Sequence, residues 1–213
     1  MVKAVFFDND GVLVDTEQLY FEATQQVLAA AGVELNEAEY IELFLVQGRG
    51  AWHLAEARGV PLPEIDRLRD ARNALYAEWL ARAPLVAAGV TSVLDALRGK
   101  YVMGVVTTCS REHFEVIHRT SRLLEYFDFV LLPGDYARKK PHPDPYLAAV
   151  ERSGVDAAAC VAVEDSERGL QSATAAGLRC LVVPNPLTRG GRFSGAYRVL
   201  TAITDIPAVL SVS

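Results

Sequence analysis

Short hydrophobic runs recur along this chain, and each one stops abruptly at polar residues. The runs that predict strands are 2–7, 101–106, 128–132, 160–163 and 180–183. Their hydrophobic residues are nearly continuous rather than alternating with polar ones, which is typical of strands buried on both faces of a parallel sheet. The pattern therefore predicts a buried parallel sheet.

Helical patterns lie between these runs. One follows Gly89, one begins at Arg111, one begins near Pro143, and one follows Ser166. Ser166 is a suitable N-cap for the last of these helices, and Gly177 is a suitable C-cap. Strands that alternate with helices imply right-handed crossover connections. We therefore predict an α/β fold built on a doubly wound parallel sheet.

Residues 16–83 depart from this alternation, since they contain helical patterns and no convincing strand. The predicted helices span 18–31, 37–46, 51–58 and 65–82. Hydrophobic residues recur at helical spacing in the first of them. We therefore predict two domains, an α/β core formed by 1–15 and 84–213 and an all-helical cap domain of residues 16–83 inserted into it.

Some side chains of the helical segment can be assigned a place or a role. We expect Trp52 and Trp79 in its interior. The arginines expected on the exposed face of the last helix are Arg67, Arg69 and Arg72. Arg49 lies in a turn flanked by glycines. Its guanidinium could bind an anionic substrate, or it could be an ordinary solvated side chain, and the sequence leaves both interpretations open.

Composition and charge narrow the function classes. The chain has 213 residues and a formal net charge of −6, with 21 Lys plus Arg against 27 Asp plus Glu. This acidic balance argues against a general nucleic-acid binder, which needs a basic surface to meet phosphates. No hydrophobic run approaches the ~18 residues of a membrane span. We therefore expect neither nucleic acid nor a membrane as a partner, and we infer no obligatory protein partner.

The N-terminus and the cysteines bear on the cellular compartment. The first hydrophobic run meets Asp8 too early to form the apolar stretch of a secretory signal. Three cysteines cannot all pair, and an odd, sparse set fits a reducing environment. We therefore expect a cytoplasmic protein.

Polar residues gather where the predicted strands end. The set consists of Asp8, Asp10, Thr107, Glu164 and Asp165. In a doubly wound sheet, ligands bind beyond the carboxyl ends of the strands. The sequence therefore predicts a functional site at that edge of the sheet.

Asp8 and Asp10 form the most distinctive pair in this set. Residues two apart on an extended segment point to the same side, so both carboxylates can face one site. Gly11 then lets the chain turn away. Two neighbouring carboxylates repel each other and need a cation or a shared proton. An isolated pair of this kind is more often an ordinary loop or N-cap pair. The surrounding residues are therefore needed to tell a functional pair from an ordinary one.

The longer string FFDNDGVLVDTE resembles the first motif of the haloacid dehalogenase superfamily of aspartate-nucleophile phosphohydrolases, in the branch with a helical cap. Three further segments resemble the later motifs in the same order. They are Thr107 at the end of YVMGVV, Lys140 in KKPHPDPYLAAV, and Glu164 with Asp165 in VAVEDSERGLQSATAAGL. The match is most similar to the phosphoglycolate phosphatase and β-phosphoglucomutase group, and its spacing extends over essentially the whole chain.

The resemblance implies a Mg²⁺ cofactor. Mg²⁺ is a hard cation that proteins usually hold with one or two carboxylates together with phosphate and water. Asp8 and Asp165 would supply the carboxylates, with Glu164 supporting them. The family pattern adds the backbone carbonyl of Asp10 as a further metal ligand.

The resemblance also implies the roles of the catalytic residues. Asp8 would attack phosphorus and form an aspartyl-phosphate, which splits one hard displacement into two easier ones. Asp10 would protonate the leaving oxygen and later take a proton from water. Thr107 would donate its hydroxyl to a phosphoryl oxygen. Lys140 would neutralise charge on the nucleophile and the phosphoryl group.

Two positions, each next to a motif residue, depart from the family pattern. Thr108 stands where relatives commonly have Asn, and we expect it to add a backbone or hydroxyl contact to the substrate. Lys139 stands where the family more often has Gly. Lys140 begins the K-P-x-P-D pattern and is the better candidate for the site, but the sequence alone leaves open which lysine enters it.

These motifs predict a Mg²⁺-dependent phosphatase of a small phosphorylated metabolite, either a sugar phosphate or a phosphoglycolate-like compound. A phosphohexose mutase of the β-phosphoglucomutase type is the nearest alternative. Those mutases carry a histidine in the first cap helix, where this chain has Tyr20. A dehalogenase has no use for a metal or for an acid at the second position, so Asp10 and the acidic pair argue against it.

A phospho-accepting signalling module is an alternative from a different class. Receiver domains also combine an Asp, a Thr or Ser, a Lys and an acidic pair around Mg²⁺ in a doubly wound sheet. They place the phosphorylated Asp after a middle strand, and they lack both a second Asp and a helical segment of this size. These differences favour the phosphatase.

Overall fold

The computed structural model describes residues 1–211 and contains a six-stranded parallel sheet in the order β3-β2-β1-β4-β5-β6. The strands are β1 (Ala4–Phe7), β2 (Val102–Val106), β3 (Phe129–Leu131), β4 (Cys160–Glu164), β5 (Arg179–Val182) and β6 (Arg198–Val199). β1 lies between β2 and β4, with Ala4 opposite Val102 on one side and Cys160 on the other. The prediction of an α/β fold with a parallel sheet is confirmed.

Each of the five predicted runs overlaps a strand, and β6 is the one strand of the described chain that the sequence pattern missed. All four residues of β1 are buried, as are all five of β4. β6 has only two residues, both exposed, at an edge of the sheet. An exposed edge strand needs no hydrophobic run, so it leaves no pattern to detect.

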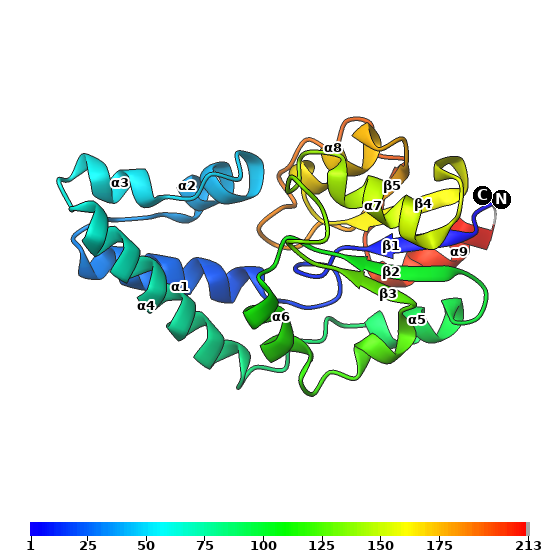
Figure 1. Cartoon of the computed structure of the whole chain (residues 1–213), viewed down its shortest axis with the longest axis horizontal. Coiled ribbons are helices and arrows are strands. Elements are labelled where there is room, and N and C mark those ends of the chain that lie inside the picture. Colours follow the sequence, from blue (N-terminus) through cyan, green and yellow to red (C-terminus); the bar gives the residue numbers. More distant parts are fainter. Residues whose placement is uncertain (212–213) are drawn as a thin grey trace. The chain divides into compact units, whose positions relative to one another are not determined.

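Helices cover both faces of the sheet (Figure 1). The α-helices are α5 (Val90–Leu97), α6 (Arg111–His118), α7 (Asp144–Ser153), α8 (Glu167–Ala175) and α9 (Ile206–Ser211). Short 3₁₀ turns accompany them: η2 (Leu123–Tyr126), η3 (Ala157–Ala159) and η4 (Ile203–Asp205). Helices α7 and α8 pack on one face through a core that includes Phe6, Ala162 and Tyr146, while α5 packs with α9 on the other face.

The ends of α8 follow from its sequence. The Ser166 hydroxyl accepts a hydrogen bond from the Gly169 N–H, which satisfies one of the free donors at the helix start. Beyond the helix end, Gly177 has a φ of +81°, a left-handed conformation that glycine adopts without strain. Both predicted caps of this helix are therefore present.

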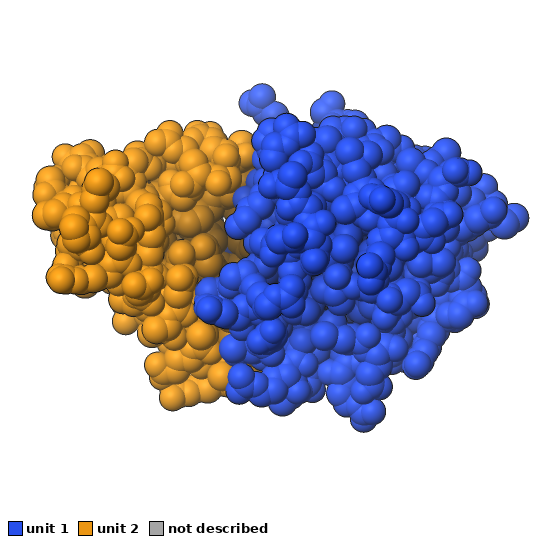
Figure 2. Space-filling model, in the orientation of Figure 1, with its two compact units in different colours: residues 1–15, 85–213 blue, residues 16–84 orange. Residues whose placement is uncertain are grey.

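The chain divides into two compact units (Figure 2). One unit comprises Met1–Asp15 and the chain from Leu85 onward, and the other is Thr16–Pro84. The Asp15 N–H donates to the Leu85 carbonyl at 2.8 Å, and Val14 forms an antiparallel bridge with Val86. The chain therefore leaves the sheet-containing unit and returns to it at two segments that are hydrogen-bonded to each other.

Every residue of Thr16–Pro84 is described, and none forms a strand. Its helices are α1 (Glu17–Ala30), α2 (Glu37–Tyr40), the π-helix η1 (Ile41–Val46), α3 (Trp52–Ala57) and α4 (Leu62–Leu80). The sequence predicted one helix over 37–46, whereas the structure changes from α to π at Ile41. A hydrophobic pattern does not distinguish these two helix types, because they differ in hydrogen-bond spacing.

Arg72 is not on the exposed face of α4, so that expectation was wrong. Arg72 is only 7% exposed, and its guanidinium lies 4.3 Å from the centre of the Tyr20 ring. It donates to the Thr24 hydroxyl at 3.3 Å and to the Asn73 side chain at 3.0 Å. Stacking on an aromatic ring stabilises a guanidinium in a position that a helical pattern assigns to solvent.

Arg67 and Arg69 are exposed and pair with Glu64 and Asp66, as the predicted exposed face requires. Trp52 and Trp79 are each half-buried rather than fully enclosed. Among the described residues, no helix combines the length and the hydrophobicity that crossing a bilayer would need.

Candidate active site

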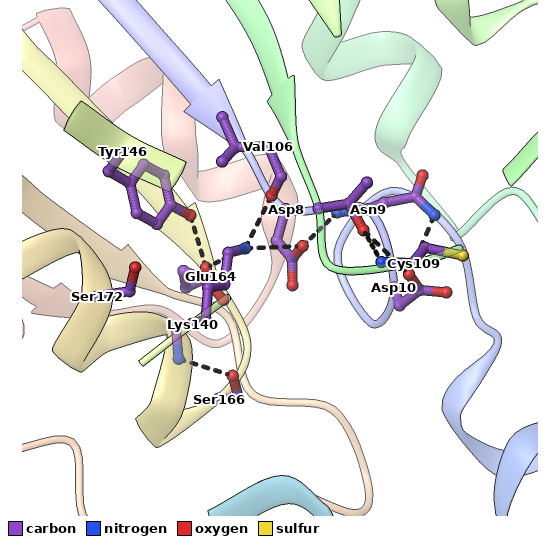
Figure 3. A network of polar contacts seen from close by, with 12 residues as sticks. Asp8, Asn9, Asp10, Val106, Cys109, Lys140, Tyr146, Glu164, Ser166 and Ser172 are labelled. Carbon is purple, nitrogen blue, oxygen red and sulfur yellow. Dashed lines mark hydrogen bonds and ion pairs between the residues drawn. The ribbon is translucent and has the colours of Figure 1, made fainter. Parts of the chain in front are cut away.

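Three adjacent strands bring the predicted site residues together at one edge of the sheet (Figure 3). Asp8 follows β1, Thr107 follows β2, and Glu164 is the last residue of β4. These strands are neighbours and run in parallel, so their carboxyl ends meet. Residues far apart in the sequence therefore face a single centre.

Lys140 is the cation of this centre. Its Nζ lies 2.9 Å from Asp8 Oδ1 and 2.7 Å from Glu164 Oε1, and it donates to the Val106 carbonyl at 2.8 Å. All three partners can be followed in Figure 3. Lys140 is 5% exposed, whereas Lys139 is exposed. The structure thus places Lys140, and not Lys139, at the site.

Burial alone would disfavour the ammonium charge of Lys140, but the carboxylates of Asp8 and Glu164 outweigh it and raise the pKa of Lys140. Burial, followed by the charge of Asp8, raises the pKa of Glu164. Burial also raises the pKa of Tyr146 well above its usual value. The Tyr146 hydroxyl therefore stays protonated and donates a hydrogen bond to Glu164 Oε1 at 2.5 Å.

Asp8, Glu164 and Asp165 form an acidic cluster, in which one carboxylate oxygen from each lies within 4.8 Å of the others. Asn185 donates to Asp165 Oδ2 at 2.7 Å and orients it. Glu164 Oε2 is buried and has no hydrogen-bond partner among the described residues. Lys140 pairs with two of the three carboxylates, and carboxylate oxygens are the donors that hard divalent cations prefer. The residues therefore fit a metal ion such as Mg²⁺.

Two glycines allow the backbone to approach these carboxylates closely. Gly11 has a φ of +78°, and a side chain there would overlap the Asp165 carboxylate and the Asn185 amide. A side chain at Gly169 of α8 would overlap the Glu164 carboxylate. The acidic cluster therefore depends on glycine at both positions.

Asp10 and Thr107 form a second contact beside this cluster. The Thr107 hydroxyl donates to Asp10 Oδ2 at 3.4 Å and accepts from the Cys109 N–H at 3.0 Å. The Tyr136 hydroxyl donates to the Thr107 carbonyl at 2.6 Å. The side chain of Asp10 is not part of the acidic cluster. The proposed metal contact through its backbone carbonyl remains a prediction.

Thr108 and Arg49 were also singled out from the sequence. Thr108 is half-buried next to Thr107. Arg49 belongs to the helical unit, where it is exposed between Gly48 and Gly50, and its N–H donates to the Leu43 carbonyl at 3.0 Å. Both glycines have positive φ, so the turn is tight. The substrate contacts predicted for these two residues remain predictions.

Sequence reasoning did not assign a site role to four residues that bond to the candidate site residues or their neighbours: Asn9, His118, Tyr146 and Asn185. Asn185 could have been found, because it lies just beyond the carboxyl end of a predicted strand, three residues after β5 ends at Val182. Tyr146 was expected only as part of a helix, since nothing in a helical pattern shows where a hydroxyl points. His118 lies in the predicted helix that begins at Arg111, and the hydrophobic pattern does not show that it is 8% exposed and bonded to Asn9 at 2.7 Å.

The buried His118 predicts a pH dependence of stability. Burial lowers its pKa from 6.5 to about 4. Between pH 4 and 6.5 the unfolded chain binds a proton at His118 more readily than the folded chain does. The contribution of neutral His118 to the free energy of unfolding is therefore fully present above pH 6.5 and is lost as the pH falls towards 4. The loss should reach about 3 kcal/mol. Denaturant unfolding of the native chain and of a His118→Gln variant should diverge over this range, and parallel curves would contradict the assignment.

Comparison with known proteins supplies the family. The family model described as haloacid dehalogenase-like hydrolase matches residues 5–183. The chain belongs to the haloacid dehalogenase-like hydrolases. The predicted family and the prediction of a hydrolytic enzyme are therefore confirmed.

Several relatives are similar to this protein over most of its chain. Protein CbbY of Cereibacter sphaeroides is 36% identical over 220 residues, which cover 97% of this chain and 94% of that protein. A phosphorylated carbohydrates phosphatase of Thermotoga maritima is 32% identical, covering 83% of this chain and 82% of its own.

Solved structures extend the comparison. The crystal structure of CbbY from Rhodobacter sphaeroides with phosphate is 31% identical, covers 97% of this chain and 96% of its own, and has a TM-score of 0.79. A second structure of that protein, with xylulose-(1,5)bisphosphate, has the same identity and TM-score and covers 96% of each chain.

Proposed function

We propose that this haloacid dehalogenase-like hydrolase is a Mg²⁺-dependent phosphatase that hydrolyses a phosphorylated sugar through an aspartyl-phosphate on Asp8. The observation that carries the proposal is the buried Lys140 between Asp8 and Glu164, with Asp165 beside them. Lys140 carries one positive charge against the two carboxylates that it contacts, and a phosphate ester would add further negative charge. A bound divalent cation would supply the positive charge that lets the anionic ester approach.

Asp8 is the proposed nucleophile. The Asn9 N–H donates to its Oδ1 at 2.8 Å, and Lys140 lies 2.9 Å from the same oxygen. Two donors on one oxygen hold the carboxylate in a fixed orientation, which lowers the entropic cost of in-line attack. As Asp8 bonds to phosphorus, the bond from phosphorus to the sugar oxygen breaks. Lys140 stabilises the charge on both groups.

Asp10 is the proposed acid and base. It gives its proton to the departing sugar oxygen, and it then takes a proton from the water that attacks the phosphorylated Asp8. This attack releases inorganic phosphate and regenerates both carboxyl groups. The Thr107 hydroxyl, 3.4 Å from Asp10 Oδ2, can donate to a phosphoryl oxygen once substrate is bound.

The relatives support a sugar as the alcohol part of the substrate. CbbY of R. sphaeroides was crystallised with xylulose-(1,5)bisphosphate. Other relatives are described as a phosphorylated carbohydrates phosphatase and as hexitol phosphatase B. A phosphoglycolate-like substrate is the second choice. We do not favour a mutase, because Tyr20 stands where those enzymes have a histidine and instead packs against Tyr76 with ring centres 5.0 Å apart.

The test is the release of inorganic phosphate from a panel of sugar monophosphates, sugar bisphosphates, phosphoglycolate and nucleotides, with and without Mg²⁺. Removing the metal with EDTA should lower the rate by at least about 10²-fold, because metal charge stabilisation contributes several kcal/mol to such transition states. Adding Mg²⁺ back should restore the rate. Full activity in EDTA, or no phosphate release from any compound, would overturn the proposal.

Arg49 is proposed to bind the substrate outside the reacting phosphate. Arg49→Ala should then raise KM for the best sugar phosphate by about tenfold, the effect of losing one charge-assisted hydrogen bond. The KM for a small aryl phosphate should change little, because that compound has no further polar group to bind. Equal losses for both substrates would make Arg49 a structural residue.

A further inference from the structure

A chain of hydrogen bonds leads from the end of α6 to Asp10. Ser121 Oγ lies 2.9 Å from His118 Nδ1, and His118 Nε2 lies 2.7 Å from Asn9 Oδ1. Asn9 Nδ2 then donates to Asp10 Oδ2 at 3.3 Å. Asn9 is fully buried and His118 is 8% exposed, so water does not compete strongly for these bonds.

The donors and acceptors along this chain run in one direction. Ser121 Oγ accepts from the Leu123 N–H, so its own proton is available for His118 Nδ1. A neutral His118 that accepts at Nδ1 carries its proton on Nε2 and donates it to Asn9 Oδ1. Burial keeps the imidazole neutral.

The histidine thereby selects one of the two orientations of the Asn9 amide. If the amide were turned over, its NH₂ would face the Nε2–H and its oxygen would face the Asp10 carboxylate. Both contacts would then be repulsive. With the amide as observed, its NH₂ points at Asp10 (Figure 3).

We propose that Asn9 and His118 are positioning residues for Asp10, a role that rests on the proposed phosphatase function. The Asn9 amide and the Thr107 hydroxyl both donate to Asp10 Oδ2, at 3.3 and 3.4 Å. When the Thr107 hydroxyl turns to a phosphoryl oxygen of bound substrate, the Asn9 amide still holds the Asp10 carboxylate in place. Asp10 has to act twice in each turnover, first on the sugar oxygen and then on water, so its position affects both steps.

Removing the amide tests the first link. Asn9→Leu keeps the size of the side chain and the backbone N–H that donates to Asp8, but it removes the donor to Asp10. We expect kcat to fall at least about tenfold, because small displacements of a catalytic group have effects of this size or larger. KM should stay within about twofold, because Asn9 holds a proton-transfer group rather than the substrate.

Two replacements of His118 test the second link. His118→Phe keeps a ring beside Phe114, whose ring centre lies 4.4 Å away, but it cannot donate to Asn9. It should lower kcat nearly as much as Asn9→Leu does. In His118→Gln the terminal NH₂ can reach the place of Nε2 and donate to Asn9, so most of kcat should return. A merely structural histidine would show no such rescue.

A matched control separates positioning from loss of stability. Ile117 precedes His118 on α6, is 3% exposed and bonds to none of these polar groups. Ile117→Ala should lower the melting temperature at least as much as His118→Phe but leave kcat nearly unchanged. If Ile117→Ala lowers kcat to the same extent, the effect of His118 comes from the stability of the helix and the proposal is wrong.

The double variant Asn9→Leu/His118→Phe completes the experiment. If the two residues act along one path, the double variant should be no slower than Asn9→Leu alone. If the fold-loss of kcat in the double variant equals the product of the two single losses, or if either single variant is fully active, the positioning role is wrong. If the native chain itself hydrolyses no phosphate ester, or if Asp8→Asn keeps full activity, then the proposed function fails. If the native chain is active, Asp8→Asn is inactive and Asn9→Leu is unaffected, only this inference fails.

Discussion

Asp8→Asn should lower kcat by at least about 10⁴-fold, a loss comparable to removing the nucleophile of other enzymes that act through a covalent intermediate. An amide is a poor nucleophile, so no aspartyl-phosphate can form at this position. The fold should persist, because the change removes one negative charge from an acidic cluster and leaves Glu164 to pair with Lys140. Phosphate release and thermal unfolding, measured on the same preparation, check both expectations.

Asp156→Asn is the matched control. Asp156 is an exposed carboxylate that precedes η3, which leads into β4 at the opposite end of that strand from Glu164. It should retain native kcat, since it removes the same charge far from the site. An acid-labile phosphoryl group trapped on the native chain, and absent from Asp8→Asn, would add direct support. Measurable turnover by Asp8→Asn above the background of the assay would remove Asp8 from its role.

Lys140→Met should abolish activity and also destabilise the protein by about 3 kcal/mol, the typical cost of breaking a buried ion pair from one side. Methionine has a similar length, so the loss reflects charge and hydrogen bonds rather than a cavity. Asp8 and Glu164 would be left as buried carboxylates without their cation. Urea unfolding at neutral pH measures the stability, and phosphate release measures the activity.

Lys139 provides the control for this prediction. It is the neighbouring residue, it has the same chemistry, and it is exposed. Lys139→Met should change the free energy of unfolding by no more than about 0.5 kcal/mol, as is usual for surface positions. If the two variants lose equal stability or equal activity, then the buried ion pair is not the source of either effect.

Much of the fold could be predicted because burial leaves a readable pattern. The strands that carry the candidate site are buried on both faces, so their hydrophobic runs are continuous and end sharply at Asp8, Thr107 and Glu164. The rule that ligands bind at carboxyl strand ends then brings distant residues together without any coordinates. β6 is short and exposed, so it has no hydrophobic run and could not be predicted in this way.

Contacts that depend on the direction of a side chain could not be predicted. A helical pattern counts His118 and Tyr146 as members of a face, but it does not reveal that one bonds to Asn9 and the other to Glu164. Arg72 was misplaced for a related reason. Its charge predicts exposure to solvent. The Tyr20 ring on which its guanidinium stacks belongs to a different helix, so the pattern of one helix does not reveal the contact.

The paired crossings at Asp15 and Leu85 have an evolutionary consequence. Because the chain leaves and re-enters the sheet-containing unit at hydrogen-bonded neighbours, the intervening segment closes a loop whose ends are already together. The entropic cost of such a loop grows only slowly with its length. The length and sequence of the segment between these crossings can therefore change at little entropic cost, while every strand of the sheet keeps its neighbours.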